Sequence, residues 1–167
     1  DKHVVTAETD NLLHPALYAQ RRLLYIWRGD LHSFHRRKPR LGPLVVIGAG
    51  AMGQQIAMNT VMNGREHSYK VILCDSFEGA IGKAEKWASD YLSGRVAKGR
   101  LTQEEADKIA DCLTITKDVD TAVSEADFII EAIIENLEIK RELFRKISRI
   151  CRPDAVLGTN SSNIVSS

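Results

Sequence analysis

The stretch LVVIGAGAMG, from Leu44 to Gly53, decides the fold that we expect of this chain of 167 residues. Its apolar half predicts a short buried strand, and its glycines form the pattern G-x-G-x-x-G at the start of a predicted helix. Gly48 allows a tight turn, Gly50 lets the backbone approach a pyrophosphate, and Gly53 lets the helix pack close to the strand. The amides at the helix N-terminus then face the phosphates. The stretch predicts a dinucleotide site, and the alternative is a glycine-rich turn without function.

An acid, Asp75, follows the second predicted strand and lies 22 residues beyond Gly53. A carboxylate at this position accepts hydrogen bonds from a ribose diol and repels a 2′-phosphate. The next residues, Ser76 and Phe77, bring no positive charge for that phosphate. The sequence therefore favours NAD over NADP as the cofactor. The alternative is that Asp75 is a simple strand-end or helix-cap residue.

Short apolar runs alternate with amphipathic segments from Leu44 onward, which is typical of a parallel sheet with helices on both faces. We expect an α/β fold of the Rossmann type, doubly wound and mainly parallel, with a helical hairpin inserted after the second strand. The expected strands are 44–48, 70–75, 113–116, 127–133 and 155–159, and the expected helices are 52–62, 78–95, 102–112 and 137–151. Asn63-Gly64 predicts a helix C-cap, and residues 65–68 an added surface loop.

Residues 1–43 are expected to form an N-terminal extension or linker before a globular domain at 44–167. The first part carries a net charge of +4 and the second a net charge of −3, so the domain has no basic surplus that would indicate nucleic acid. Within the extension, Arg21 to Arg28 could form an amphipathic docking helix, followed by a basic linker. The alternatives are an organellar targeting sequence or a linker without chemistry of its own.

Three cysteines, Cys74, Cys112 and Cys151, lie far apart and lack the C-x-x-C spacing of a zinc site. Their number and spacing give no disulfide framework either, so no metal is predicted and a reducing intracellular compartment is favoured, whether cytoplasmic, mitochondrial matrix or peroxisomal. No apolar run approaches the roughly 20 residues that span a bilayer, so no membrane span is expected.

Acids interrupt or follow an apolar run, Asp127 to Glu135, that is typical of a central parallel strand. Glu131 is expected at the end of this strand and Glu135 beyond it, at the carboxyl edge where ligands bind in open α/β sheets. Lys140 follows in the first turns of the next helix, where it could equally be a surface residue. The last expected strand runs into the polar residues 160–163, which suit a ligand site or an ordinary turn.

Residues 44–167 resemble the N-terminal NAD-binding domain of the L-3-hydroxyacyl-CoA dehydrogenases. The resemblance rests on five segments in the correct order: Gly48-Ala49-Gly50-Ala51-Met52-Gly53, Asp75, Lys98-Gly99-Arg100-Leu101-Thr102, residues 131–140 and Thr159-Asn160-Ser161-Ser162. It implies hydride transfer between the 3-hydroxyl of an acyl-CoA and NAD in fatty-acid metabolism and β-oxidation.

The resemblance also implies roles for single residues. The glycine segment and Asp75 would bind NAD, with Glu135, Lys140 and Asn160 lining the cofactor cleft. Ser162 would be the catalytic serine that hydrogen-bonds the reacting oxygen of the substrate, although its neighbour Ser161 is easily confused with it. Lys98 would contact a phosphate of CoA.

The resemblance also implies a catalytic His-Glu pair on a C-terminal helical domain for substrate binding and dimerisation, and we expect both to be missing from this chain. A hydroxyl group that loses hydride must also lose its proton to a base, and histidine is the usual base at neutral pH. No histidine follows His67. We therefore expect NAD binding without appreciable turnover by this chain alone, and an apolar face that meets the helical domain or supports a homo-oligomer. The alternatives are a related β-hydroxyacid or carnitine-type dehydrogenase domain and a non-catalytic NAD-responsive binding module.

Overall fold

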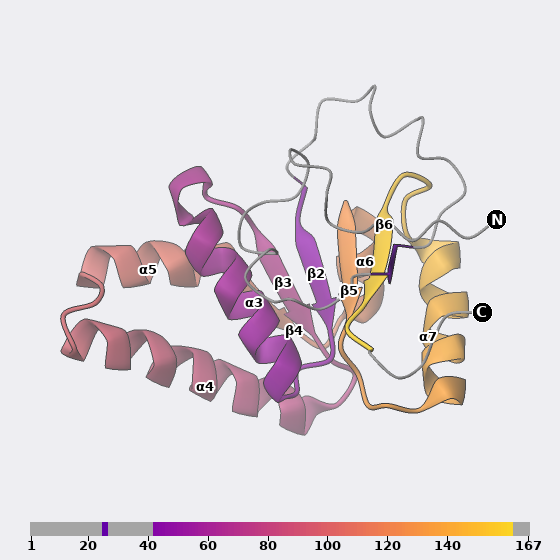
Figure 1. The fold of residues 1–167 in the computed structure, drawn as a ribbon, viewed down its shortest axis with the longest axis horizontal. Coiled ribbons are helices and arrows are strands. Elements are labelled where there is room, and N and C mark those ends of the chain that lie inside the picture. The colour runs from indigo at the N-terminus through magenta and orange to yellow at the C-terminus, as the bar shows by residue number, and fades with distance from the viewer. Residues whose placement is uncertain (1–24, 27–41, 162–167) are drawn as a thin grey trace.

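The computed structural model describes residues 25–26 and 42–161, in which a six-stranded sheet lies between two layers of helices (Figure 1). The strands lie in the order β1-β6-β5-β2-β3-β4. Their bounds are β1 (Tyr25–Ile26), β2 (Leu44–Ile47), β3 (Val71–Cys74), β4 (Leu113–Thr116), β5 (Phe128–Glu131) and β6 (Val156–Thr159). Strands β2 to β6 pair in parallel, and β1 pairs with β6 in the antiparallel direction. The expected α/β class with a mainly parallel sheet is confirmed.

Helices cover both faces of the sheet because the side chains of a strand point alternately to its two faces. In β2, Leu44 and Val46 contribute to the core beneath one helical layer, and Val45 and Ile47 to the core beneath the other. The first layer holds α3 (Ala51–Gly64), α4 (Glu78–Ala97) and α5 (Gln103–Cys112), and the second holds α6 (Val119–Glu125) and α7 (Leu137–Ile150). All four residues of β2 are buried, as is typical of a central parallel strand.

Strand order reverses at β2, which has β3 on one side and β5 on the other. The chain therefore crosses over one face after β2 and over the opposite face after β5, and a crevice is expected at the carboxyl ends of the strands. Helices α3, α4 and α7 all begin at this edge, which is the lower edge of the sheet in Figure 1. We call it the carboxyl edge.

The inserted hairpin of α4 and α5 lies beyond edge strand β4 and extends away from the sheet (Figure 1). Trp87 and Tyr91 stack with their ring centroids 5.2 Å apart, and both pack against the core. The guanidinium of Arg95 lies over the Tyr91 ring and donates to its hydroxyl oxygen at 2.8 Å. These aromatic residues therefore belong to the packing of the hairpin.

Three expectations were wrong or incomplete. Gly64 is the last residue of α3 in an ordinary helical conformation rather than a left-handed cap, and a Cβ atom there would lie 2.6 Å from the Cβ of Tyr69. Residues Tyr25–Ile26 form a strand rather than part of an amphipathic helix, because they pair with β6. Helix α6 was not expected, and it is capped by Asp118, whose carboxylate accepts a hydrogen bond from Thr121 N at 3.1 Å.

Candidate cofactor site

The glycine turn joins the end of β2 to the start of α3, and two of its glycines are required by the fold itself. Gly48 has φ +110°, and a Cβ atom on it would lie 2.6 Å from the carbonyl oxygen of Ala132. A Cβ atom on Gly53 would overlap the carbonyl oxygen of Gly48, so the helix packs directly on the turn. Both roles agree with the sequence analysis.

Gly50 has a different environment, since no heavy atom lies within 4 Å of the position that a Cβ would occupy. Its φ of −71° and ψ of −178° are accessible to any residue. Neither packing nor backbone conformation therefore requires glycine here. The open space lies at the N-terminus of α3, beside the exposed residues Ala51 and Met52, where backbone amides and the helix dipole favour an anion.

Asp75 follows β3 and is bound to the glycine turn. Its Oδ2 accepts a hydrogen bond from Ala49 N at 2.8 Å, and its Oδ1 accepts one from Phe77 N at 3.0 Å. The carboxylate is half-buried, and the following residues Ser76 and Phe77 are exposed. The structure thus brings Asp75 to the glycine turn, as the spacing predicts, with no basic side chain directly after it.

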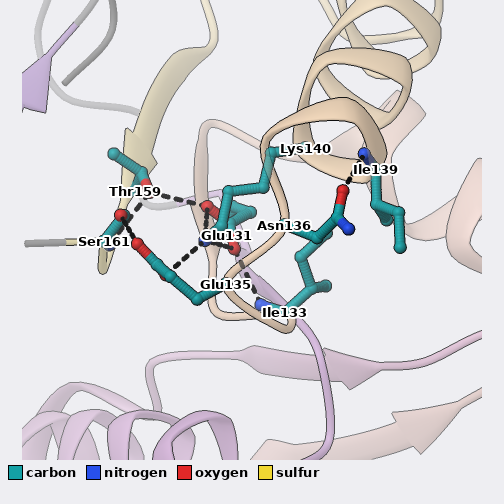
Figure 2. A network of polar contacts seen from close by, with 8 residues as sticks. All are labelled: Glu131, Ile133, Glu135, Asn136, Ile139, Lys140, Thr159 and Ser161. Atoms are coloured by element: carbon teal, nitrogen blue, oxygen red, sulfur yellow. Dashed lines mark hydrogen bonds and ion pairs between the residues drawn. The ribbon is translucent and has the colours of Figure 1, made fainter. Parts of the chain in front are cut away.

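A second group of polar residues lies where β5 and β6 end and α7 begins (Figure 2). Glu131, with no exposed surface, is the last residue of β5. Its carboxylate contacts Lys140 Nζ at 2.8 and 3.0 Å and accepts hydrogen bonds from Ile133 N at 2.7 Å and from the Thr159 hydroxyl at 2.6 Å. We call Glu131, Glu135, Lys140, Thr159 and Ser161 the strand-end network.

Lys140 is 5% exposed, so the alternative of an ordinary surface lysine is wrong. Besides Glu131 it contacts Glu135 Oε2 at 3.3 Å. Glu135 in turn accepts a hydrogen bond from the hydroxyl of Ser161, which is buried. The main-chain amide of Asn160 donates to the carbonyl oxygen of Glu131 at 2.8 Å. Three predicted cofactor residues, Glu135, Lys140 and Asn160, therefore come together at the carboxyl edge.

The start of α7 explains how this helix delivers Lys140 to the network. Asn136 caps the helix, and its side-chain oxygen accepts a hydrogen bond from Ile139 N at 3.1 Å. Lys140 N donates to Asn136 O at 3.0 Å in the first complete turn. Because the capping residue Asn136 lies only four residues before Lys140, the lysine side chain can reach back to the end of β5.

Of the two predicted substrate residues, Lys98 and Ser162, the structure describes only Lys98. Lys98 is exposed at the far end of α4, a helix of 20 residues that starts at the carboxyl edge. A helix of that length extends about 30 Å, so the structure does not bring Lys98 to the glycine turn. Ser162 lies outside the described residues.

The sequence did not lead us to predict Thr159 or Glu131 as site residues, although Glu131 was expected at the end of its strand. The available signal was an acid at the end of an otherwise apolar strand, since a buried carboxylate needs a cation or several donors. Among the described residues no group of three or more histidine, cysteine or acidic side chains has the geometry of a metal site. Within the same ranges, no helix is long and apolar enough to cross a bilayer.

Fold and site together define a dinucleotide-binding domain of the doubly wound α/β class. The family model for the NAD-binding domain of 3-hydroxyacyl-CoA dehydrogenase matches residues 43–167, so the chain belongs to this family and its cofactor is NAD. This agrees with the family, fold and cofactor that the sequence predicts.

Known proteins with similar sequences or structures support the same assignment. The mouse mitochondrial hydroxyacyl-coenzyme A dehydrogenase is 31% identical over 127 residues, covering 72% of this chain and 39% of that protein. A peroxisomal fatty acid β-oxidation multifunctional protein of Arabidopsis thaliana is 31% identical over 128 residues, covering 76% of this chain and 17% of that protein. The crystal structure of 3-hydroxybutyryl-CoA dehydrogenase from Escherichia coli K12 matches with a TM-score of 0.65 and 35% identity, covering 73% of this chain and 25% of that one. The chain thus spans about two fifths or less of these relatives.

Proposed function

We propose that this chain is the cofactor-binding part of a 3-hydroxyacyl-CoA dehydrogenase, and that residues 44–167 form its NAD-binding domain. The observation that carries the proposal is the open space at Gly50, beside the N-terminus of α3 and next to an acid that is hydrogen-bonded to the glycine turn. The turn can admit a pyrophosphate there while Asp75 lies on the side of β3. When bound, NAD supplies a hydride acceptor for the carbon that carries the hydroxyl.

Each end of the cofactor has its own residues in this proposal. Residues 48–53 hold the pyrophosphate and Asp75 the adenosine ribose. The other half of the dinucleotide then lies over β5 and β6, on the opposite side of β2, where Glu135, Lys140 and Asn160 orient the nicotinamide. The structure already connects Asp75 to two main-chain amides, so a ribose diol would share this carboxylate with them.

Substrate binding and turnover would involve residues beyond this site. We propose that Ser162 hydrogen-bonds the reacting oxygen of an acyl-CoA and that Lys98, at the exposed tip of the hairpin, contacts a CoA phosphate. The proton of the hydroxyl needs a base, and the histidines of this sequence all occur at or before position 67. We therefore expect the 167-residue chain to bind NAD and to leave 3-hydroxyacyl-CoA unoxidised.

An apolar rim favours a further domain, or a second copy of this chain, at the carboxyl edge. Five large apolar side chains of the described residues are exposed at or beside it: Met52, Phe77, Ile134, Leu137 and Ile139. Exposed apolar clusters of this kind mark surfaces that meet another domain or a ligand. The names of two relatives place them in mitochondria and peroxisomes, and the free thiols of the buried Cys74 and Cys112 fit a reducing compartment.

The experiment that tests the cofactor site is Gly50→Ala, followed by calorimetric titration with NAD. Because an added Cβ meets no protein atom, we expect unfolding by urea to be unchanged and the affinity for NAD to fall at least tenfold. Gly82→Ala is the matched control, since Gly82 also has no heavy atom within 4 Å of its Cβ position but lies in α4. Equal NAD affinities for the Gly50 variant and the wild type would contradict the proposal.

A further inference from the structure

Glu131 is the one acid of the strand-end network that has no exposed surface, so it cannot touch a ligand itself. Both of its carboxylate oxygens have two polar contacts each (Figure 2). Oε1 contacts Ile133 N and Lys140 Nζ, and Oε2 contacts Lys140 Nζ and the Thr159 hydroxyl. These donors come from the loop after β5, from α7 and from the end of β6. A single buried carboxylate thus joins the loop after β5, the start of α7 and the end of β6.

Each residue assigned above to the nicotinamide half is attached to Glu131 directly or through one atom. Lys140 forms an ion pair with it, Glu135 shares the same Lys140 ammonium, and Asn160 N donates to the Glu131 carbonyl oxygen. Asp75, which is assigned to the adenosine ribose, has different supports. Asp75 is bound to Ala49 N and Phe77 N, neither of which contacts Glu131.

We infer that Glu131 is a positioning residue that fixes the nicotinamide half of the site while leaving the adenosine and pyrophosphate half independent. The inference rests on the proposed function. A buried carboxylate with four polar contacts holds its partners in one geometry because releasing any of them would leave a buried charge less well compensated. The negative charge of Glu131 is the essential property, since it draws the Lys140 ammonium away from solvent and against the end of β5.

A role limited to general stability predicts a different result. If Glu131 merely stabilised the fold, its loss would weaken every ligand of the chain to the same degree. If it positions one half of the site, its loss weakens the binding of NAD and leaves the binding of ADP-ribose unchanged. ADP-ribose contains the adenosine and pyrophosphate but lacks nicotinamide. The ratio of the two dissociation constants in one protein sample therefore separates the two roles.

The test compares NAD and ADP-ribose by calorimetry on the 167-residue chain and on Glu131→Gln, which keeps the size of the side chain and removes its charge. We expect the dissociation constant for NAD to rise at least tenfold and that for ADP-ribose to change less than twofold. Glu138→Gln is the matched control, because Glu138 is an exposed acid of α7 that pairs with Arg141. It should leave both constants unchanged.

Thr159→Val keeps the inference testable if the Gln variant does not fold, since it removes the hydroxyl that donates to Glu131 and preserves the shape. This variant should raise the dissociation constant for NAD about threefold and leave that for ADP-ribose unchanged. An unchanged ratio in the folded variants would overturn the role of Glu131 while leaving the NAD site intact. A wild-type chain that bound neither ligand would instead overturn the proposed function and this inference with it.

Discussion

Lys140→Met should strongly destabilise the folded chain. The methionine fills the space of the lysine stem, so the main loss is the ammonium group. The side chain of Lys140 is 6% exposed and that of Glu131 0%, and the lysine Nζ lies 2.8, 3.0 and 3.3 Å from three carboxylate oxygens. Removing it leaves the Glu131 charge buried with only two hydrogen-bond donors, Ile133 N and the Thr159 hydroxyl.

The magnitude follows from the burial of the pair. Breaking a buried ion pair by removing one partner lowers the free energy of unfolding by about 3–5 kcal/mol. With a urea m-value of about 2 kcal/mol/M, the midpoint of unfolding should fall by roughly 2 M. The exposed pair of Arg141 and Glu138 on the same helix gives the matched comparison, and Arg141→Met should lower the free energy by less than about 1 kcal/mol.

The double variant Lys140→Met/Glu131→Gln distinguishes a buried charge from a general packing defect. Because it removes both charges together, it should recover more than half of the loss caused by Lys140→Met. Urea unfolding followed by circular dichroism measures all four proteins. A loss below about 1 kcal/mol for the single variant, or a double variant no more stable than the single one, would refute the reasoning.

Three other variants test different parts of the molecule. Burial, then the charges of Asp75 and Asp118, raises the pKa of the Cys74 thiol from 9.0 to about 12. The Cys74 thiol therefore loses its proton near pH 9 in the unfolded chain but only near pH 12 in the folded one. The free energy of unfolding that this thiol contributes is fully present below pH 9 and should fall as the pH rises toward 12. Between pH 9 and 12 the free energy of unfolding in urea should fall more steeply with pH for the wild type than for Cys74→Ala, by up to about 1.4 kcal/mol per pH unit. Equal pH dependences in the two proteins would contradict this. Thr102→Ala breaks the capping box of α5 and should lower the free energy of unfolding by about 1 kcal/mol. Its NAD affinity should be unchanged, and a calorimetric loss would show that the hairpin contributes to the cofactor site. Asp75→Ala combined with Ser76→Arg should weaken the binding of NAD at least tenfold and strengthen the binding of NADP, since arginine pairs with a 2′-phosphate. An unchanged NADP constant would place the adenosine ribose elsewhere.

Local patterns were sufficient for most of the fold. Strand β4 has the predicted bounds, and the other parallel strands differ from the predicted ranges by one to three residues. The capping box at Thr102 was readable because its two partners are three residues apart. Helix α6 escaped prediction because it has only seven residues, too few for a clear helical period. Gly64 was misread because its reason lies in Tyr69, which packs against it.

The sequence by itself determined the family, the glycine turn and the acid after the second parallel strand, because each depends on residues close together in the chain. It also placed Glu131, Glu135 and Lys140 near one edge of the sheet. Only the tertiary structure decided which of them is buried and which contacts which. Their contacts join β5, α7 and β6, and the pairing of β5 with β6 brings Thr159 beside Glu131. Burial then turned a lysine that could equally have lain on the surface into the partner of a fully enclosed carboxylate.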